Sequence, residues 1–311
     1  MNFWEAQRKA RLRTMLYVFI FIALTLLVAT LSEFALRLFA ADYYDSSFPL
    51  FGTAFLIVTV AVAGYNYGMY HQYGGGYVAE SLGARQILAN GSDLKEQQLF
   101  NIVQEVALAT ALPMPKVYLL PSKEINAFAA GLTRENAAIT VTQGALTLLN
   151  RDELQGVIAH EFGHVYNGDM LISMRLAAMV MGFFFVLYLG LRLLQMGRFR
   201  SRGSDGKGGN PTMIAALIFI VSGAITWFVG SILKATISRQ REYLADACAV
   251  QFTRNPNGIA GALRKIAKEQ YHDMPQTGSA YAHMYLEDHS SIFATHPPIQ
   301  KRIAAIENTP G

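Results

Sequence analysis

The chain has 311 residues, of which 52% are hydrophobic and only 15% are charged, a balance far from that of soluble globular proteins. Its formal net charge of +4 comes from scattered basic residues, without the interleaved aromatic and basic residues of a nucleic-acid-binding surface. Cys248 is the single cysteine, which excludes an intramolecular disulfide. We therefore expect an integral membrane protein that also carries a soluble domain.

Four hydrophobic segments predict helices in contact with a membrane. They comprise residues 15–32, 48–70, 176–191 and 213–233. The third segment lies between Arg175 and Arg192. At about 24 Å as a helix, it fits a thin bilayer only if these arginines extend towards the surface. The predicted division is two transmembrane helices (1–70), a first soluble part (71–175), a hydrophobic hairpin (176–233) and a second soluble part (234–311).

Basic residues ahead of the first segment predict the orientation of the chain. This region contains Arg8, Lys9, Arg11 and Arg13. By the positive-inside rule it stays in the cytoplasm, the loop at 37–47 lies outside, and the chain returns to the cytoplasm near His71. The soluble domain after the second segment is therefore expected in the cytoplasm.

The soluble part predicts a mainly helical fold with a small β-sheet. Residues 94–111 have helical periodicity, with an apolar stripe that includes Leu99, Val103 and Leu108. Short strands are expected at 116–120, 126–129 and 138–142, and a further helical stretch at 144–149.

The next helix carries the most informative motif. His160 and His164 are four residues apart, so on a helix both imidazoles lie on one face and can share a metal ion. Glu161 stands beside the first histidine, where a carboxylate can activate a metal-bound water. Asn150 is a suitable N-cap for a helix over 151–166.

A catalytic zinc site needs a third protein ligand. Asn167 and Met170 do not match the metzincin pattern, and the stretch at 183–188 contains no carboxylate. The next acidic residues in a helical pattern are Glu242 and Asp246, which are four residues apart. They can provide a ligand and a carboxylate that orients a histidine, or they can belong to a solvated charged helix face.

If His164 and Glu242 bind the same ion, the hairpin between them crosses the membrane an even number of times. Two crossings would export the basic loop at 198–207, against the positive-inside rule. No crossing would leave an apolar hairpin buried shallowly. We favour two crossings because both segments are strongly apolar.

Five motifs occur in a fixed order along the chain. They are Asn126-Ala127-Phe128-Ala129, His160-Glu161-x-x-His164, Asn167-Gly168-Asp169, Ser238-Arg239-x-Arg241-Glu242-x-x-Ala245-Asp246-Ala247 and Thr295-His296-Pro297-Pro298. With them the sequence resembles the HtpX family of integral-membrane zinc metallopeptidases, which are of the gluzincin type and related to the CAAX prenyl proteases. One departure is Phe162-Gly163, where bacterial heat-shock members often carry Leu-Ser, and this difference concerns the subfamily.

The resemblance implies a zinc endopeptidase that binds one zinc ion per chain through His160, His164 and Glu242. Glu161 would be the general base, and Asp246 would orient His160 or His164. It further implies a multi-pass protein of the bacterial cytoplasmic membrane, with the active site facing the cytoplasm. Its partners would be the lipid bilayer and protein or peptide substrates, including misfolded and membrane proteins cleaved in quality control and stress response.

Further residue roles have alternatives. By the resemblance, His296 stabilises the oxyanion of the reaction, or it is a structural histidine that caps its turn. By the resemblance, the segment Asn126-Ala127-Phe128 is expected near an exposed sheet edge, where proteases bind extended substrate. Asn126 would contact the substrate backbone, whereas Phe128 would contact substrate or pack in the core.

Two other functions compete with the protease. A catalytically inactive scaffold is disfavoured because every expected ligand and the base are present. A metal-dependent membrane transporter is disfavoured because the hydrophobic segments lack paired ionisable residues.

Overall fold

A computed structural model of the chain describes residues 3–200, 211–268 and 297–307. The chain forms two compact units. The first comprises Met1–Asn66 and Ala178–Leu233, and the second comprises Tyr67–Ala177 and Lys234–Gly311. A compact unit is not by itself a domain that folds alone, so the four-part division at residues 70, 175 and 233 stays a prediction.

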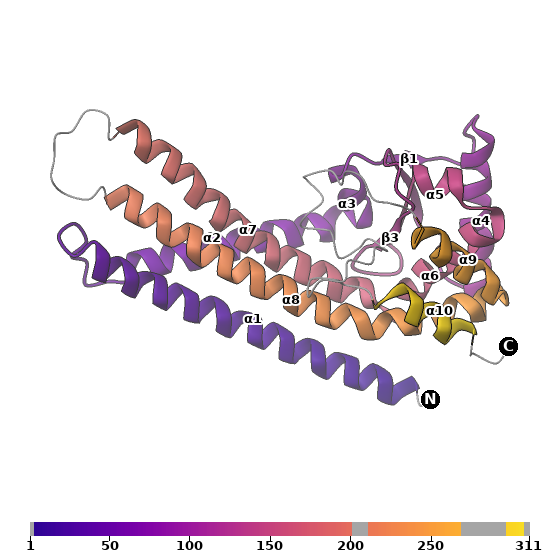
Figure 1. The fold of residues 1–311 in the computed structure, drawn as a ribbon, viewed down its shortest axis with the longest axis horizontal. Helices are drawn as coiled ribbons and strands as arrows, with labels where there is room; N and C mark the ends of the chain where they lie inside the picture. The colour runs from indigo at the N-terminus through magenta and orange to yellow at the C-terminus, as the bar shows by residue number, and fades with distance from the viewer. Residues whose placement is uncertain (1–2, 201–210, 269–296, 308–311) are drawn as a thin grey trace. The chain divides into compact units, whose positions relative to one another are not determined.

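The first unit is built from long hydrophobic helices (Figure 1). Its helices are α1 (Phe3–Phe39), α2 (Leu50–Tyr73), the greater part of α7 (Asp169–Arg200) and the first half of α8 (Pro211–Thr253). Each contains a stretch long and apolar enough to cross a membrane: Val18–Phe39, Leu50–Tyr73, Asp169–Met196 and Thr212–Ile232. This confirms the expected four membrane-associated helices.

Helix α1 corrects the predicted end of the first hydrophobic segment at residue 32. The helix continues to Phe39, so its span-length part contains Glu33 and Arg37, whose carboxylate and guanidinium lie 2.8 Å apart. Glu33 also accepts hydrogen bonds from the backbone N–H groups of Phe51 and Gly52, at 2.9 and 3.0 Å, in the first turn of α2. The expectation that these segments lack paired ionisable residues was therefore wrong. Through Glu33, the pair links the last turns of α1 to the first turn of α2.

Helix α7 is also longer than the segment predicted at 176–191. Its span-length part extends over Asp169–Met196 and includes Arg175 and Arg192. The Arg192 Nε donates a hydrogen bond of 2.7 Å to the hydroxyl of Tyr188 on the same helix. The continuous helix is therefore longer than the predicted segment at both ends.

The second unit contains a four-stranded mixed sheet in the order β1-β2-β4-β3. Its strands are β1 (Arg85–Ile87), β2 (Lys116–Leu120), β3 (Ala127–Ala130) and β4 (Ala138–Thr142). The central strands β2 and β4 are parallel, whereas β1 and β3 pair antiparallel at the two edges. The three strands predicted from the sequence are present, and β1 is an additional strand.

Helices form most of the second unit. They are α3 (Gly75–Ser81), α4 (Leu94–Thr110), α5 (Gln143–Leu148), α6 (Arg151–Asn167), α9 (Pro256–Ile266) and α10 (Ile299–Glu307), together with the second half of α8. On α4, Leu99 and Val103 are buried as expected, but Leu108 is 76% exposed. Leu108 follows Leu99 by nine residues, which places it on the opposite face of a helix. The mainly helical fold with a small sheet is confirmed.

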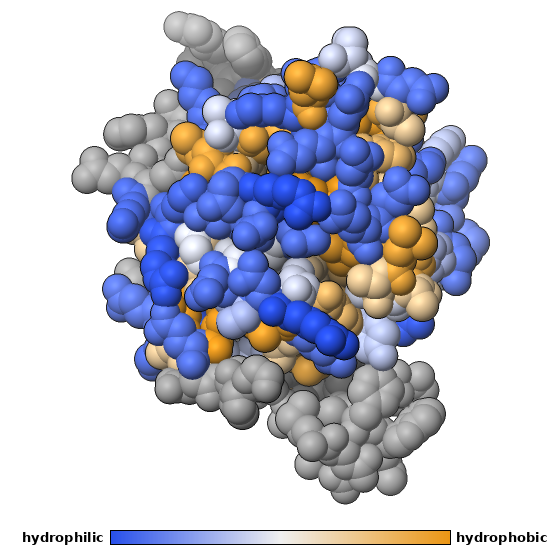
Figure 2. All heavy atoms as spheres, turned by 90° about the vertical axis from the view of Figure 1, so that its right-hand side faces the viewer, coloured by the Kyte–Doolittle hydropathy of each residue, from blue (hydrophilic) through white to orange (hydrophobic). Residues whose placement is uncertain are grey.

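Helix α6 is the centre of the second unit. It packs against α9, α4 and β3, with Val157, Ile158 and Phe162 in the core. Figure 2 shows the face of the molecule formed by the right-hand end of Figure 1, where hydrophilic residues surround smaller hydrophobic patches.

Two glycines of α6 permit its closest contacts. A Cβ on Gly156 would lie 2.4 Å from the backbone nitrogen of Ile259 on α9. A Cβ on Gly163 would lie 3.0 Å from the Cα of Ala245 on α8. The histidine-bearing helix therefore lies directly against both neighbours.

Candidate metal centre

Both ends of α6 are fixed by local hydrogen bonds. The Asn150 side chain accepts a bond of 2.9 Å from the Glu153 N–H, and the Glu153 carboxylate accepts one of 2.8 Å from the Asn150 N–H. This capping box satisfies backbone donors at the start of the helix. At the other end, Gly168 adopts a left-handed conformation with φ of 74°, as expected for a C-cap glycine. The helix predicted at 151–166 is thereby confirmed, and it holds His160 and His164 on a rigid backbone.

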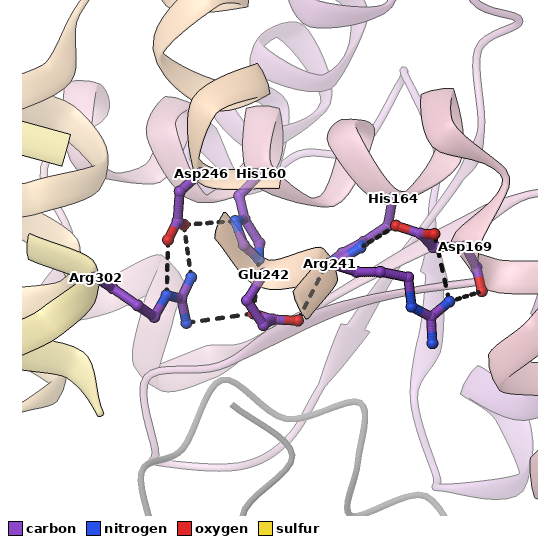
Figure 3. Close-up of polar contacts among 7 residues, drawn as sticks. All are labelled: His160, His164, Asp169, Arg241, Glu242, Asp246 and Arg302. Carbon is purple, nitrogen blue, oxygen red and sulfur yellow. Dashed lines mark hydrogen bonds and ion pairs between the residues drawn. The ribbon is translucent and has the colours of Figure 1, made fainter. Parts of the chain in front are cut away.

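Three side chains from α6 and α8 converge on one point (Figure 3). The Nε2 atom of His160 lies 3.5 Å from one carboxylate oxygen of Glu242, and the Nε2 atom of His164 lies 3.5 Å from the other. One ligand atom from each of the three residues lies within 4.8 Å of the other two. The hydrophobic hairpin separates these residues in the sequence, and the fold brings them together.

The donors fit a tetrahedral divalent ion. Ligand atoms about 2.1 Å from such an ion lie about 3.4 Å from one another. The observed 3.5 Å separations are close to that value and too long for ordinary hydrogen bonds. His160 Nε2 is fully buried and makes no hydrogen bond with any described residue. Two imidazole nitrogens and a carboxylate are also the donor set of a catalytic zinc site.

Asp246 lies behind His160, on the side away from Glu242. Its carboxylate is 2.9 Å from the Nδ1 atom of His160. The sequence left open which histidine Asp246 contacts, and the structure places it beside His160. A carboxylate in this position fixes the ring so that Nε2 faces the ion.

Arg302 on α10 is a residue of this site that the sequence analysis did not identify. It donates two hydrogen bonds to Asp246, of 2.8 Å from Nε and 2.7 Å from Nη2, and its Nη1 lies 3.4 Å from Glu242. Its side chain is 0% exposed. A buried guanidinium thus balances part of the negative charge of two buried carboxylates.

These charges change the acidity of the buried groups. Burial alone would raise the pKa of Asp246, but the charge and hydrogen bonds of Arg302 outweigh this effect and hold that pKa far below its usual value. Burial opposes protonation of His160, yet the neighbouring carboxylates of Asp246 and Glu242 raise the pKa of its imidazole to about 9 in the metal-free protein. Protons and a metal ion therefore compete for this ring.

His164 has a different carboxylate neighbour. Its Nδ1 lies 3.3 Å from Asp169, the first residue of α7. Arg241 on α8 donates to the backbone carbonyl of Asp169 at 2.9 Å, and its Nη1 lies 3.4 Å from the Asp169 carboxylate. The sequence analysis used Asp169 only as part of a helix-ending motif. Its position five residues after His164 is the signal that would have indicated this contact.

The remaining predicted site residues differ in how they are placed. Glu161 is 3% exposed on α6, next to His160. Phe128 is 2% exposed, so its side chain packs in the interior of the unit. His296 lies outside the described residues.

Asn126 precedes the edge strand β3 and is fully buried. Its side-chain oxygen accepts a hydrogen bond of 2.8 Å from the Ala127 N–H, and its backbone oxygen accepts one of 3.0 Å from Thr142 on β4. Opposed residues in an antiparallel pair alternate between hydrogen-bonded and non-hydrogen-bonded positions. Because Asn126 is hydrogen-bonded to Thr142, the backbone groups of Ala127 and Ala129 point away from β4.

Comparisons with known proteins agree with this site. The family model described as Peptidase family M48 matches residues 93–310. A protein named "Protease HtpX homolog" from Thermoanaerobacter pseudethanolicus is 38% identical over 282 residues, covering 88% of this chain and 91% of the relative. One of the same name from Streptococcus uberis is 37% identical over 215 residues, covering 67% of this chain and 72% of the relative. The crystal structure of S. mikatae Ste24p matches with a TM-score of 0.43 at 18% identity, covering 98% of this chain and 67% of that chain.

A metal-binding donor set, four span-length helices and these relatives together define a membrane metallopeptidase. The chain belongs to peptidase family M48. The enzyme class expected from the sequence is thus confirmed, and peptides or proteins are its substrates.

Proposed function

We propose that this protein is a zinc-dependent endopeptidase that binds one zinc ion through His160, His164 and Glu242. The observation that carries the proposal is the spacing of the three donors. The Nε2 atom of each imidazole lies 3.5 Å from a different oxygen of the Glu242 carboxylate, and one ligand atom from each of the three residues lies within 4.8 Å of the other two. Zinc prefers this donor set and geometry.

A bound zinc ion supplies Lewis acidity, which lowers the pKa of water and polarises the substrate carbonyl. Glu161 accepts a proton from the attacking water and delivers it to the nitrogen of the leaving amine. Asp246 holds the ring of His160, and Arg302 keeps Asp246 ionised and in position. By the family resemblance, His296 donates a hydrogen bond to the oxyanion that forms at the cleaved carbonyl.

We further propose that substrate binds as an added strand along β3. The outward carbonyl of Ala127 and the outward N–H and carbonyl of Ala129 would pair with an extended peptide without regard to its side chains. Asn126 fixes the start of this edge by its bond to the Ala127 N–H. Phe128 would take part through its backbone because its side chain is buried.

The proposed setting is the bacterial cytoplasmic membrane, with the zinc site in the cytoplasm and the lipid bilayer around the four span-length helices. Misfolded and membrane proteins are the proposed substrates, cleaved in quality control and stress response. Basic residues before the first span support this orientation. The second unit receives chain segments from before and after the α7–α8 hairpin, which supports an even number of crossings, and two are proposed because both helices have span length.

The first test uses the full chain purified in detergent. We expect one zinc ion per chain by elemental analysis and cleavage of casein that chelation abolishes and zinc restores. Zinc binding without cleavage would favour the scaffold function. Zinc uptake into liposomes that contain the protein, without cleavage, would favour the transporter.

A second test addresses orientation. On a Cys248→Ala background, a cysteine at Asp45, in the exposed loop between α1 and α2, should react with an impermeant thiol reagent added to intact cells. A cysteine at Glu105, exposed on α4 of the second unit, should react only after the membrane is permeabilised. The reverse pattern would contradict a cytoplasmic zinc site.

A further inference from the structure

We propose that Asp169 is a positioning residue for His164 and that Arg241 holds it in place. This inference rests on the proposed function, because it assigns these residues a role towards the zinc site. The carboxylate of Asp169 lies 3.3 Å from Nδ1 of His164, the ring nitrogen that faces away from Glu242 (Figure 3). A histidine that coordinates metal through Nε2 is oriented by the partner of its Nδ1.

The two candidate histidine ligands differ in their surroundings. The His160 side chain is 0% exposed and is enclosed by Asp246 and Glu242, whereas the His164 side chain is 17% exposed. The His164 ring is therefore less enclosed than that of His160, and Asp169 contacts it at Nδ1. A fixed carboxylate at that atom limits rotation of the ring and favours the tautomer whose Nε2 accepts the ion.

Asp169 is suited to this task by its place in the fold. It directly follows Gly168, whose left-handed conformation ends α6 and turns the chain into α7. Its carboxylate therefore lies at the junction of the two helices, next to the last turn of α6 that carries His164. Asp169 is also mostly buried, at 7% exposure, so its position is restricted by packing.

Arg241 fixes Asp169 through both its backbone and its side chain. The Nη1 atom of Arg241 lies 2.9 Å from the Asp169 carbonyl oxygen and 3.4 Å from a carboxylate oxygen. Arg241 immediately precedes Glu242 on α8. The contact therefore joins the end of the histidine helix to the helix that carries the third donor. We call this Arg241–Asp169 contact the clamp. We infer that the clamp sets the separation of His164 and Glu242 as well as the orientation of the His164 ring.

The test compares Asp169→Ala, Asp169→Asn and Arg241→Gln with the wild-type protein, all as full chains in detergent. A matched control is Arg151→Gln at the start of α6, the helix that carries His164. It removes an exposed ion pair with Glu105, 2.7 Å long. Three properties are measured: zinc affinity by competition with a chelator, the visible absorption spectrum of the Co²⁺-loaded protein, and thermal unfolding of the metal-free protein.

We expect Asp169→Ala to weaken zinc binding about 10- to 100-fold, as found for other residues that support metal ligands. Asp169→Asn keeps an acceptor but loses the charge, so its loss should be smaller. Arg241→Gln should weaken binding too, but should add little in the Asp169→Ala background, because the clamp acts through Asp169. The Co²⁺ spectrum should change in the Asp169 variants, and Arg151→Gln should match wild type in affinity and spectrum.

Wild-type zinc affinity and Co²⁺ spectra in the Asp169 variants would overturn the inference. So would variants that only lower the unfolding temperature of the metal-free protein, since that result indicates a purely structural contact. Failure of the wild-type chain to bind zinc would instead refute the proposed function, before any variant is compared.

Discussion

Arg302 donates two hydrogen bonds to Asp246 across 56 positions of the sequence, and both side chains are buried. The contact links α10 to the carboxylate that holds His160. The same guanidinium lies 3.4 Å from Glu242, and its charge also interacts with Glu161. One cation therefore acts on three acidic groups around the site.

Replacing Arg302 with Met should destabilise the metal-free protein by about 3–5 kcal/mol, because Asp246 and Glu242 would be left buried without their compensating charge. Denaturant unfolding followed by circular dichroism measures this change. The control is Arg264→Met, which removes an exposed ion pair with Glu307 and should cost less than about 1 kcal/mol. Equal effects of the two substitutions would show that Arg302 does not balance the buried charge.

Replacing Glu161 with Gln should leave zinc binding unchanged and reduce peptide hydrolysis by roughly 10²- to 10⁴-fold, since the amide cannot accept the proton of the attacking water. Elemental analysis and casein cleavage on the same preparation test both halves of this prediction. Turnover at the wild-type rate in zinc-loaded Glu161→Gln protein would assign the general base to another residue.

Replacing Glu242 with Gln should weaken zinc binding, because a neutral amide is a poorer ligand than a carboxylate. Competition with a chelator gives the two affinities. Glu105→Gln is the matched control, because Glu105 is exposed on α4 and does not belong to the donor cluster. If the Glu242 and Glu105 variants bind zinc equally well, the third ligand must be sought elsewhere.

Cys248 should report on the packing of α6 against α8. Burial raises the pKa of its thiol, the charge of Asp169 acts in the same direction, and a contact with Asn167 opposes them. Because the thiolate is the reactive form, the raised pKa lowers its fraction at pH 8, and alkylation should accelerate only at higher pH. Iodoacetamide labelling read by mass spectrometry should be slow in the native protein and fast in denaturant. Rapid labelling of native protein at pH 8 would contradict close packing here.

The sequence predicted those elements whose signals are local. Helix α6 has its capping box, its C-cap glycine and its two histidines within a short stretch of chain, so each could be recognised without tertiary information. The central strands were found because each is a short apolar run next to turn residues. By contrast, α9, α10 and β1 were not predicted. Helix α9 has local start signals, Asn255 as N-cap and Pro256 at its first position, which the sequence analysis did not use. Strand β1 has only three residues and becomes recognisable through its pairing with β2.

The metal-donor residues of the candidate site could be predicted from the sequence, whereas the residues that hold them in place could not. His160, His164 and Glu242 carry spacing and family signals. Arg302 carries neither in the sequence, and Arg241 belongs to a family motif that does not indicate its partner. Their roles depend on contacts with Asp246 and Asp169 across 56 and 72 positions. No short-range pattern encodes such a contact.

The α7–α8 hairpin that separates His164 from Glu242 also has a consequence for biosynthesis. A ribosome completes both histidines and Glu161 well before it reaches Glu242. During that interval the nascent chain has the proposed general base but only two of the three proposed donors, and two span-length segments must still be synthesised and folded back. With this donor set, proteolytic competence would be delayed until the hairpin is in place, and an unfinished chain would not attack the proteins around it.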